Sequence, residues 1–317
     1  MTMKTKSIFQ LSLFIFAVLI ISLTSCKKNT STTTQTTANT TSIQNQSNDE
    51  TAVTTASDDA LNDVNNVLGG NQGTFKSTES LPCNATLDST TAIHDTITYY
   101  ITYNGLNCDG NIFRTGQIDI KKHVHTEWHK AGATITYIYI NYHVYHVLHP
   151  DKAITINGSR TYENVSGGLL FMLGNTLDSI IHKEWGSMTI TFENNTTRSW
   201  SIARQLKYTR FDHKLILTTN GYGSGDGYDH LVMWGVNRDG EQFYDQILVP
   251  NVFKQKCEWD GCAGQRKMMI PSDNKGATIT WGYDSNNQLI TGNECPTKYK
   301  LDWYNNGQSG TMYLWLP

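Results

Sequence analysis

The sequence lacks the short motifs that mark several large classes of enzyme. It contains no G-x-S-x-G nucleophile elbow, no phosphate-binding loop and no dinucleotide fingerprint. The sequence therefore lacks the motifs by which the commonest esterases, NTPases and dehydrogenases are recognised. It also has no C-x-x-C pair, so neither a zinc knuckle nor a thioredoxin-type redox centre is expected, and no cofactor is predicted.

The N-terminus has the plan of an export signal. Lys4 and Lys6 precede an almost wholly apolar run, IFQLSLFIFAVLIISL, from Ile8 to Leu23. A positive segment followed by a short apolar segment is typical of a secretory signal. The run is shorter than the roughly 20 apolar residues that a comfortable membrane span needs.

The apolar run ends at a single cysteine. The stretch Leu23-Thr24-Ser25-Cys26 resembles a lipobox, where bacterial lipoprotein signals are cut and the cysteine becomes the lipidated N-terminus. Each buried methylene of such a lipid contributes about 0.8 kcal/mol to anchoring. The resemblance predicts a signal peptide over residues 1–25, lipidation of Cys26, and the membrane as a partner through that lipid. An uncleaved transmembrane anchor is the alternative.

The segment after the cysteine is rich in Thr, Ser, Asn and Gln. Such a segment buries too little apolar surface to offset the entropy of ordering. Residues 26–57 are therefore predicted to be a disordered tether. Lipoproteins retained in the inner membrane often carry Asp directly after the lipidated cysteine. Here that residue is Lys27, which favours delivery to the cell outer membrane. The sequence does not decide between its periplasmic and extracellular faces.

Charge argues against nucleic acid as a partner. Without residues 1–25, Lys and Arg fall from 25 to 23 against 28 acids, so the formal charge is −5. A mildly acidic chain with no basic block binds nucleic acid poorly.

The remainder, residues 58–317, is predicted to be an antiparallel β domain, or two subdomains. Segments such as TITYYITYNG, ATITYIYINYHVYHVL and TRSWSIARQLKYTRF are rich in β-branched and aromatic residues and punctuated by turn residues. Asp239-Gly240 and Asn306-Gly307 are strong hairpin signals. No helical period separates the strands, so the fold class is all-β, an antiparallel sandwich or open barrel.

One short helix is expected before the strands. In SDDALNDVNNVLGG, Ser57 can cap the N-terminus and Gly69 and Gly70 can end the helix. It should cover an end of the β domain.

Five cysteines follow Cys26, and disulfides are expected in an exported chain. Cys83 and Cys108 flank one strand-rich stretch, and Cys257 and Cys295 flank another. We predict these two pairs, each contributing about 3–4 kcal/mol. The rival pairing joins Cys257 to Cys262; otherwise Cys262 is left over.

Longer stretches resemble a known group. The opening CNATLD…TITYYITYNGLNCDGNIFRTGQIDI and the closing CEW…GATITWGY…NECPTKYKLDWYNNGQSGTMYLWL are similar to secreted β-rich lipoproteins of Bacteroidota. The likeness spans most of residues 83–317. It implies location and fold, and it carries no activity. The piece NYHVYHVLHPDKA is an insertion relative to that group.

Six of the ten histidines lie between residues 123 and 149. His123 and His125 would share one face of a strand, and an H-x-H pair with a third ligand is a reasonable zinc or copper arrangement. The alternative is a set of polar-face histidines on exposed strands.

The strand ITYIYINYHVY offers a second candidate site. Tyr137, Tyr139 and Tyr145 fall on one face by simple alternation, and a row of tyrosines can form a platform for sugar rings. The alternative is a second packed layer.

The expected function is that of a lipid-anchored cell-envelope protein with a β-rich binding or structural domain, rather than an enzyme. Its partner would be a polysaccharide or another envelope protein. A glycan-acting hydrolase, with Glu127, Asp178 and Glu184 as nominal carboxylates, and a metal-binding envelope protein are the alternatives. A hydrolase requires two carboxylates that converge in space, and sequence spacing does not establish this.

Overall fold

The computed structural model describes residues 31–70, 82–90 and 93–316, with side chains in the first range from Ile43 to Leu68. The predicted signal peptide and Cys26 lie outside these residues. The described strands are β1 (Ala85–Ser89), β2 (Thr96–Leu106), β3 (Ile112–His123), β4 (Ala133–His146), β5 (Ile154–Asn164), β6 (Ser179–Phe192), β7 (Thr197–Phe211), β8 (Lys214–Gly221), β9 (Gly223–Gly225), β10 (Tyr228–Val236), β11 (Gln242–Lys254), β12 (Gly261–Ile270), β13 (Lys275–Tyr283), β14 (Lys298–Asn305) and β15 (Gln308–Trp315). The helices are α1 (Ser31–Gly70) and the single 3-10 turns η2 (Pro150–Lys152), η3 (Leu170–Met172), η4 (Gln255–Cys257) and η5 (Pro271–Asp273).

All the described strands belong to one antiparallel sheet, which confirms the all-β prediction. Neighbours in the sheet are mostly neighbours in the sequence, and the order runs from β1 at one edge to β15 at the other. The exception is β8, which pairs with β7 and β11 beside the main path, while β7 also pairs with β10. Short hairpins of this kind need only local turn signals, which the sequence supplies.

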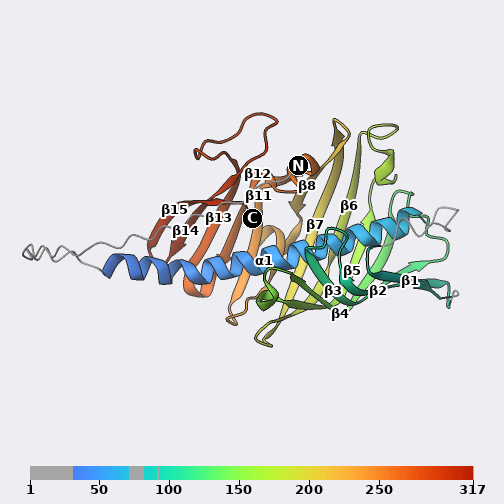
Figure 1. Cartoon of the computed structure of the whole chain (residues 1–317), viewed down its shortest axis with the longest axis horizontal. Helices are drawn as coiled ribbons and strands as arrows, with labels where there is room; N and C mark the ends of the chain where they lie inside the picture. Colours follow the sequence, from blue (N-terminus) through green and yellow to red (C-terminus); the bar gives the residue numbers. More distant parts are fainter. Residues whose placement is uncertain (1–30, 71–81, 91–92, 317) are drawn as a thin grey trace, which may run out of the picture.

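The helix α1 crosses one face of the sheet, roughly at right angles to the strands (Figure 1). Its 40 residues correspond to about 60 Å at 1.5 Å per residue. Thirteen strands at about 4.8 Å spacing are almost equally wide. A single helix can therefore cover the sheet from β14 to β2, which is why one long helix suffices to close the core.

The predicted helix is confirmed, and it ends at Gly70 as expected, but it is much longer than predicted. It begins at Ser31, so the described part of the predicted tether, residues 31–57, is helical. It also lies across the sheet rather than over one end of it. The prediction fails because composition alone cannot show that polar helix residues such as Gln46 and Glu50 are buried against the sheet.

The core lies between α1 and the inner face of the sheet. Apolar helix residues recur at helical spacing and are buried, among them Ile43, Val53, Ala60 and Val64. They meet alternate residues of the strands, which gives a main cluster over β2 to β11 and a smaller one over β12 to β14 around Ile43. The opposite, outer face of the sheet carries no helix among the described residues.

Glycines allow neighbouring strands to approach closely where the sheet bends. Gly158 has φ 130° and Gly186 has φ 154°. A Cβ at either position would lie 2.6 Å and 2.4 Å, respectively, from a backbone oxygen of the adjacent strand. Only glycine fits such positions, and glycine kinks are one means by which a sheet curves.

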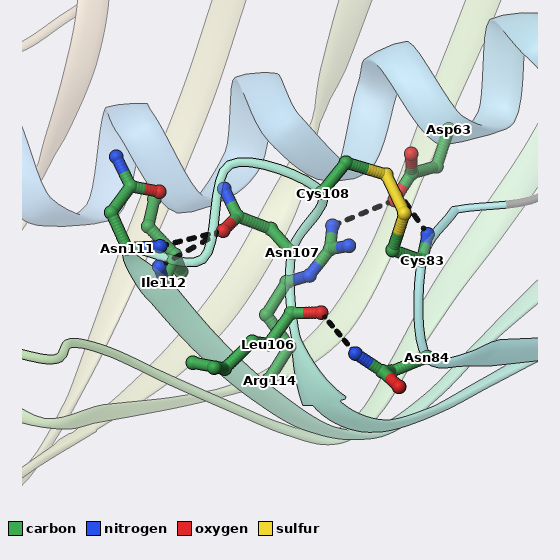
Figure 2. Close-up of a disulfide and its surroundings, with 9 residues drawn as sticks. All are labelled: Asp63, Cys83, Asn84, Leu106, Asn107, Cys108, Asn111, Ile112 and Arg114. Carbon is green, nitrogen blue, oxygen red and sulfur yellow. Dashed lines mark hydrogen bonds and ion pairs between the residues drawn. A yellow bond between two sulfur atoms is a disulfide. The ribbon is translucent and has the colours of Figure 1, made fainter.

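Both predicted disulfides are present. Cys83 pairs with Cys108, joining the start of β1 to the β2–β3 turn, and Cys257 pairs with Cys295. Figure 2 shows the first bond, with the Asn84 side chain donating to the Leu106 carbonyl at 2.8 Å. Cys262 is a buried free thiol, which excludes the rival Cys257–Cys262 pairing.

Candidate functional site

The tyrosines predicted as a sugar platform lie mostly in the core. Tyr137 is 0% exposed and Tyr139 is 1% exposed, beneath α1. The platform prediction is therefore wrong for these two residues. The cause is that this face of β4 is the inner face, packed as a second layer rather than open to solvent.

A β-bulge separates Tyr145 from the other two tyrosines. The register of β4 shifts between Tyr139 and Tyr142, where Asn141 has φ 47°. The bulge brings Tyr142 to the inner face and moves Tyr145 to the outer one, where it stacks on Phe113 with ring centroids 5.1 Å apart. Simple alternation cannot detect such an insertion.

The two candidate metal ligands lie close together at the end of β3. His123 is its last residue and His125 lies in the following loop, with ring centroids 5.3 Å apart. Both are exposed. Among the described residues no group of three or more His, Cys, Asp or Glu side chains is placed to hold a metal ion, so no third ligand joins the pair.

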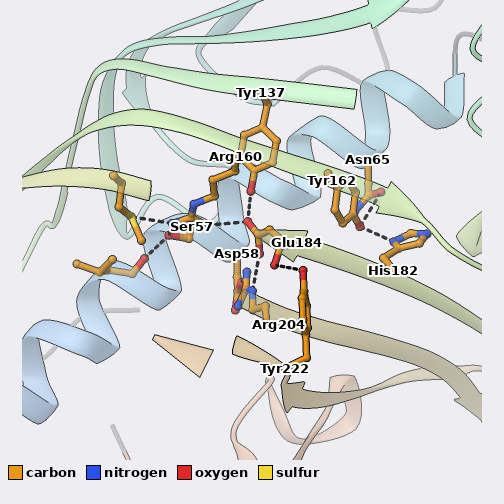
Figure 3. A network of polar contacts seen from close by, with 12 residues as sticks. Ser57, Asp58, Asn65, Tyr137, Arg160, Tyr162, His182, Glu184, Arg204 and Tyr222 are labelled. Carbon is orange, nitrogen blue, oxygen red and sulfur yellow. Dashed lines mark hydrogen bonds and ion pairs between the residues drawn. The ribbon is translucent and has the colours of Figure 1, made fainter. Parts of the chain in front are cut away.

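Glu184, one of the nominal catalytic carboxylates, is the centre of a buried polar network instead (Figure 3). Its side chain is 0% exposed. Arg160 donates to it at 2.7 Å, and Arg204 and the Tyr137 hydroxyl also donate to it. Burial alone would raise the pKa of Glu184, but Arg204 and Arg160 together lower it to about 2. At neutral pH it is therefore a charged group that pairs with the arginines of the core.

The same network holds α1 on the sheet. Arg160 donates to the Ser57 hydroxyl at 2.9 Å, and Arg204 donates to Asp58. Ser57, predicted as a helix cap, lies inside the helix and faces these arginines (Figure 3). The helix is thus attached by charge as well as by apolar packing.

Similar pairs recur along α1. In each, an acidic helix residue meets an arginine from a strand or, for Arg238, from the turn between β10 and β11, at 2.9 Å or less in two pairs and at 3.1 Å in the third. The pairs are Asp63 with Arg114, Asp49 with Arg238, and Glu50 with Arg266. Glu127 and Asp178, the other nominal carboxylates, lie in exposed loops away from this interface.

A hollow lies on the outer face of the sheet, over β6, β7 and β10. It has a volume of about 470 Å³. Three aromatic side chains line it: Trp185 from β6, Trp234 from β10 and Tyr222 between β8 and β9. We call this hollow the outer groove.

The outer groove is built by local backbone geometry. Trp185 points outward because it follows the inward-facing Glu184 on the same strand. Gly223 lies against the Trp234 ring, and a Cβ there would come within 2.6 Å of it. The Tyr222 hydroxyl donates to the Glu184 backbone oxygen at 3.3 Å, which lays its ring over β6.

Polar groups complete the groove. Ser187 and Ser201 place their hydroxyl oxygens 3.2 Å apart among the lining residues. Lys183 Nζ lies 5.2 Å from the centre of the Tyr222 ring. Glu163, opposite Lys183 in the ladder, supplies the only carboxylate among the lining residues, so the groove does not contain the carboxylate pair that glycoside hydrolysis generally uses.

Sequence reasoning missed these aromatic residues. Trp185 and Lys183 alternate on β6, which indicates a shared face, but Tyr222 and Trp234 reach that face only because β7 pairs with β10 as well as with β8. That pairing skips β8 and β9 and has no local sequence signal.

No family model, curated protein or solved structure matches this chain significantly. Among the described residues, no helix is both long enough and apolar enough to span a bilayer.

Proposed function

We propose that this chain is a lipid-anchored protein of the cell outer membrane that binds saccharide chains in the outer groove. Cys26 carries the lipid, and the β domain presents the groove. The anchor is supported by the charged, apolar and Leu-Thr-Ser-Cys segments at the N-terminus. The binding activity is supported by the composition and exposure of the groove.

The observation that carries the proposal is the convergence of three aromatic rings around two serine hydroxyls. Trp185 is 36% exposed and Tyr222 is 39% exposed, so both rings are accessible to a ligand. Sugar rings present flat apolar faces edged with hydroxyl groups, and aromatic residues with nearby polar groups complement both. A volume of about 470 Å³ lies within the range of ordinary ligand sites.

A glycan array tests this proposal. The mature chain with Cys26→Ser, which prevents acylation, should bind a subset of the immobilised saccharides. Trp185→Ala should weaken binding to that subset by roughly tenfold or more, as truncation of a central aromatic contact does.

Trp315→Ala is the matched control. Trp315 is exposed on β15 and does not line the groove, so its loss should leave saccharide binding unchanged. The proposal would be wrong if no saccharide were bound, or if Trp185→Ala bound as tightly as the parent chain.

A further inference from the structure

The loops at one edge of the sheet carry an uneven share of exposed apolar side chains. Successive turns of an antiparallel sheet emerge at alternate ends, so the loops after β1, β3, β5, β7, β9, β11 and β13 share one end with the last residues of β15. Figure 1 shows the loops after β5, β7 and β13 projecting on the same side. We call this end the loop edge.

Every part of the loop edge except the β3–β4 and β9–β10 loops carries a large apolar residue that is at least 41% exposed. The least exposed is Trp259 at 41% and the most exposed is Phe171 at 67%. The set is Ile93, Phe171, Phe211, Trp259, Leu289 and Trp315. In the described loops at the opposite end, the exposed large apolar residues are Val147, Leu148 and Tyr222, the last of which lines the outer groove.

The local structure keeps these side chains outward. Phe171 belongs to the sequence LLFML, where the flanking Leu169 and Leu173 are buried and fix the η3 turn. Trp259 has φ 69°, a strained conformation for a bulky residue that the surrounding structure must impose. The Cys257–Cys295 disulfide joins the loop of Trp259 to that of Leu289.

The length of chain before α1 limits where the domain can lie. Cys26 precedes Ser31, the first helical residue, by five positions. Five residues span at most about 18 Å when fully extended. A lipid at Cys26 would therefore hold the N-terminal end of α1 close to the bilayer surface, and the sheet attached to the helix with it.

We propose that the loop edge rests on the bilayer and inserts these apolar side chains into its interfacial layer. The inference rests on the proposed lipid anchor. Trp and Phe side chains are suited to the interface. Six exposed apolar side chains on a single edge also bury more apolar area there than scattered ones would. Basic residues at the adjoining strand ends, Lys122, Arg210, Lys214, Lys254 and Lys298, offset the acidic residues of the loops, so zwitterionic lipid should suffice.

Fluorescence quenching by lipid tests the inference. The native acylated chain would be reconstituted into vesicles of phosphatidylcholine and phosphatidylethanolamine with brominated acyl chains, which quench indole only at short range. The vesicle-bound protein should show quenching that is lost in the Trp259→Phe/Trp315→Phe variant. Trp185→Phe, in the outer groove, should leave the quenching unchanged.

A second pair of variants leaves the reporters in place. Phe171→Ser with Phe211→Ser should reduce the quenching of Trp259 and Trp315, whereas Leu148→Ser, at the opposite end, should not. Protein that is bound to vesicles but not quenched, quenching that survives the double tryptophan variant, or dimers cross-linked through the loop edge would overturn the inference. A chain that does not associate with vesicles at all would instead reject the anchor on which the inference rests.

Discussion

Arg160 on β5 and Glu184 on β6 form an ion pair at 2.7 Å in which neither side chain is exposed at all. The pair lies beneath α1 and reaches the helix through Ser57. A buried charge is costly unless it is fully paired, so this cluster specifies where the helix must lie. It also assigns Glu184 a structural task.

The Glu184→Gln variant should be strongly destabilised. It removes the anion and leaves Arg160 and Arg204 buried without their shared counter-charge, which should cost about 4 kcal/mol. Urea denaturation of the two proteins measures the difference. Lys300→Met, which breaks a partly exposed pair with Asp302, should cost about 1 kcal/mol or less. Equal losses in the two variants would contradict the role given to Glu184.

A methyl group at Gly186 should also destabilise the sheet. Its Cβ would lie 2.4 Å from the Ser159 backbone oxygen, and φ is 154°. We expect Gly186→Ala to cost about 1–3 kcal/mol in thermal or urea unfolding. Gly292→Ala, where a Cβ would meet no atom within 4 Å, should be close to neutral, and a similar cost there would argue against close strand approach as the cause.

Stability should depend on pH through Asp59. Burial raises the pKa of Asp59 from 3.8 to about 7, against the lowering effect of Arg114, and its buried Oδ2 has no hydrogen-bond partner among the described residues. Because the folded pKa is raised, the stabilisation is complete below about pH 4 and is lost as pH rises through 7. Asp59→Asn should therefore match the parent chain near pH 4 and exceed it in urea midpoint near pH 8.

The comparison with Asp59→Asn is needed because His182 acts in the opposite direction. Burial lowers the pKa of His182 from 6.5 to about 3, so its contribution is complete above 6.5 and is lost as pH falls. The pH profile of the parent chain alone therefore combines the opposite effects of Asp59 and His182 on stability. An Asp59→Asn variant that tracks the parent at every pH would reject the assignment.

Removal of the Cys257–Cys295 disulfide should cost about 4 kcal/mol, as loop closure over 38 residues suggests. Chemical denaturation of a Cys257→Ser/Cys295→Ser variant measures the loss. Cys262 is unpaired, so unfolding without reductant should expose one alkylatable thiol in the Cys26→Ser chain. Labelling at Cys257 and Cys295 as well, located by peptide mapping, would show that this disulfide does not form.

The strands and disulfides were predictable because their signals are local or nearly so. Alternation identifies the strands, and Asn306-Gly307 identifies a hairpin that indeed joins β14 to β15. The C-terminal end of α1 was equally clear, since Gly69 and Gly70 mark it. Each of these features depends on a few adjacent residues.

The first half of α1 was not predictable from composition, because its polar residues are paired with partners far along the chain. Asp49 pairs with Arg238, 189 positions away. A signal did exist: Ile43, Glu50 and Val53 recur at helical spacing, and all three are buried. Recognising it requires treating Glu50 as an inward-facing residue, which only its partner Arg266 justifies.

The outer groove was hidden for a similar reason. Trp185 and Trp234 lie 49 positions apart in the sequence. They line the same hollow because β7 is the single strand between β6 and β10 in the sheet. The tyrosine row of β4 was a stronger local pattern, but the pattern did not reveal which face α1 covers.

Mass spectrometry of the N-terminal peptide of the native protein tests the account most directly, since both the envelope location and the contact with the bilayer depend on the anchor. The account predicts a chain that begins at Cys26 and carries a diacylglyceryl group on its sulfur. A chain that retains residues 1–25, or that begins elsewhere with an unmodified terminus, would contradict it.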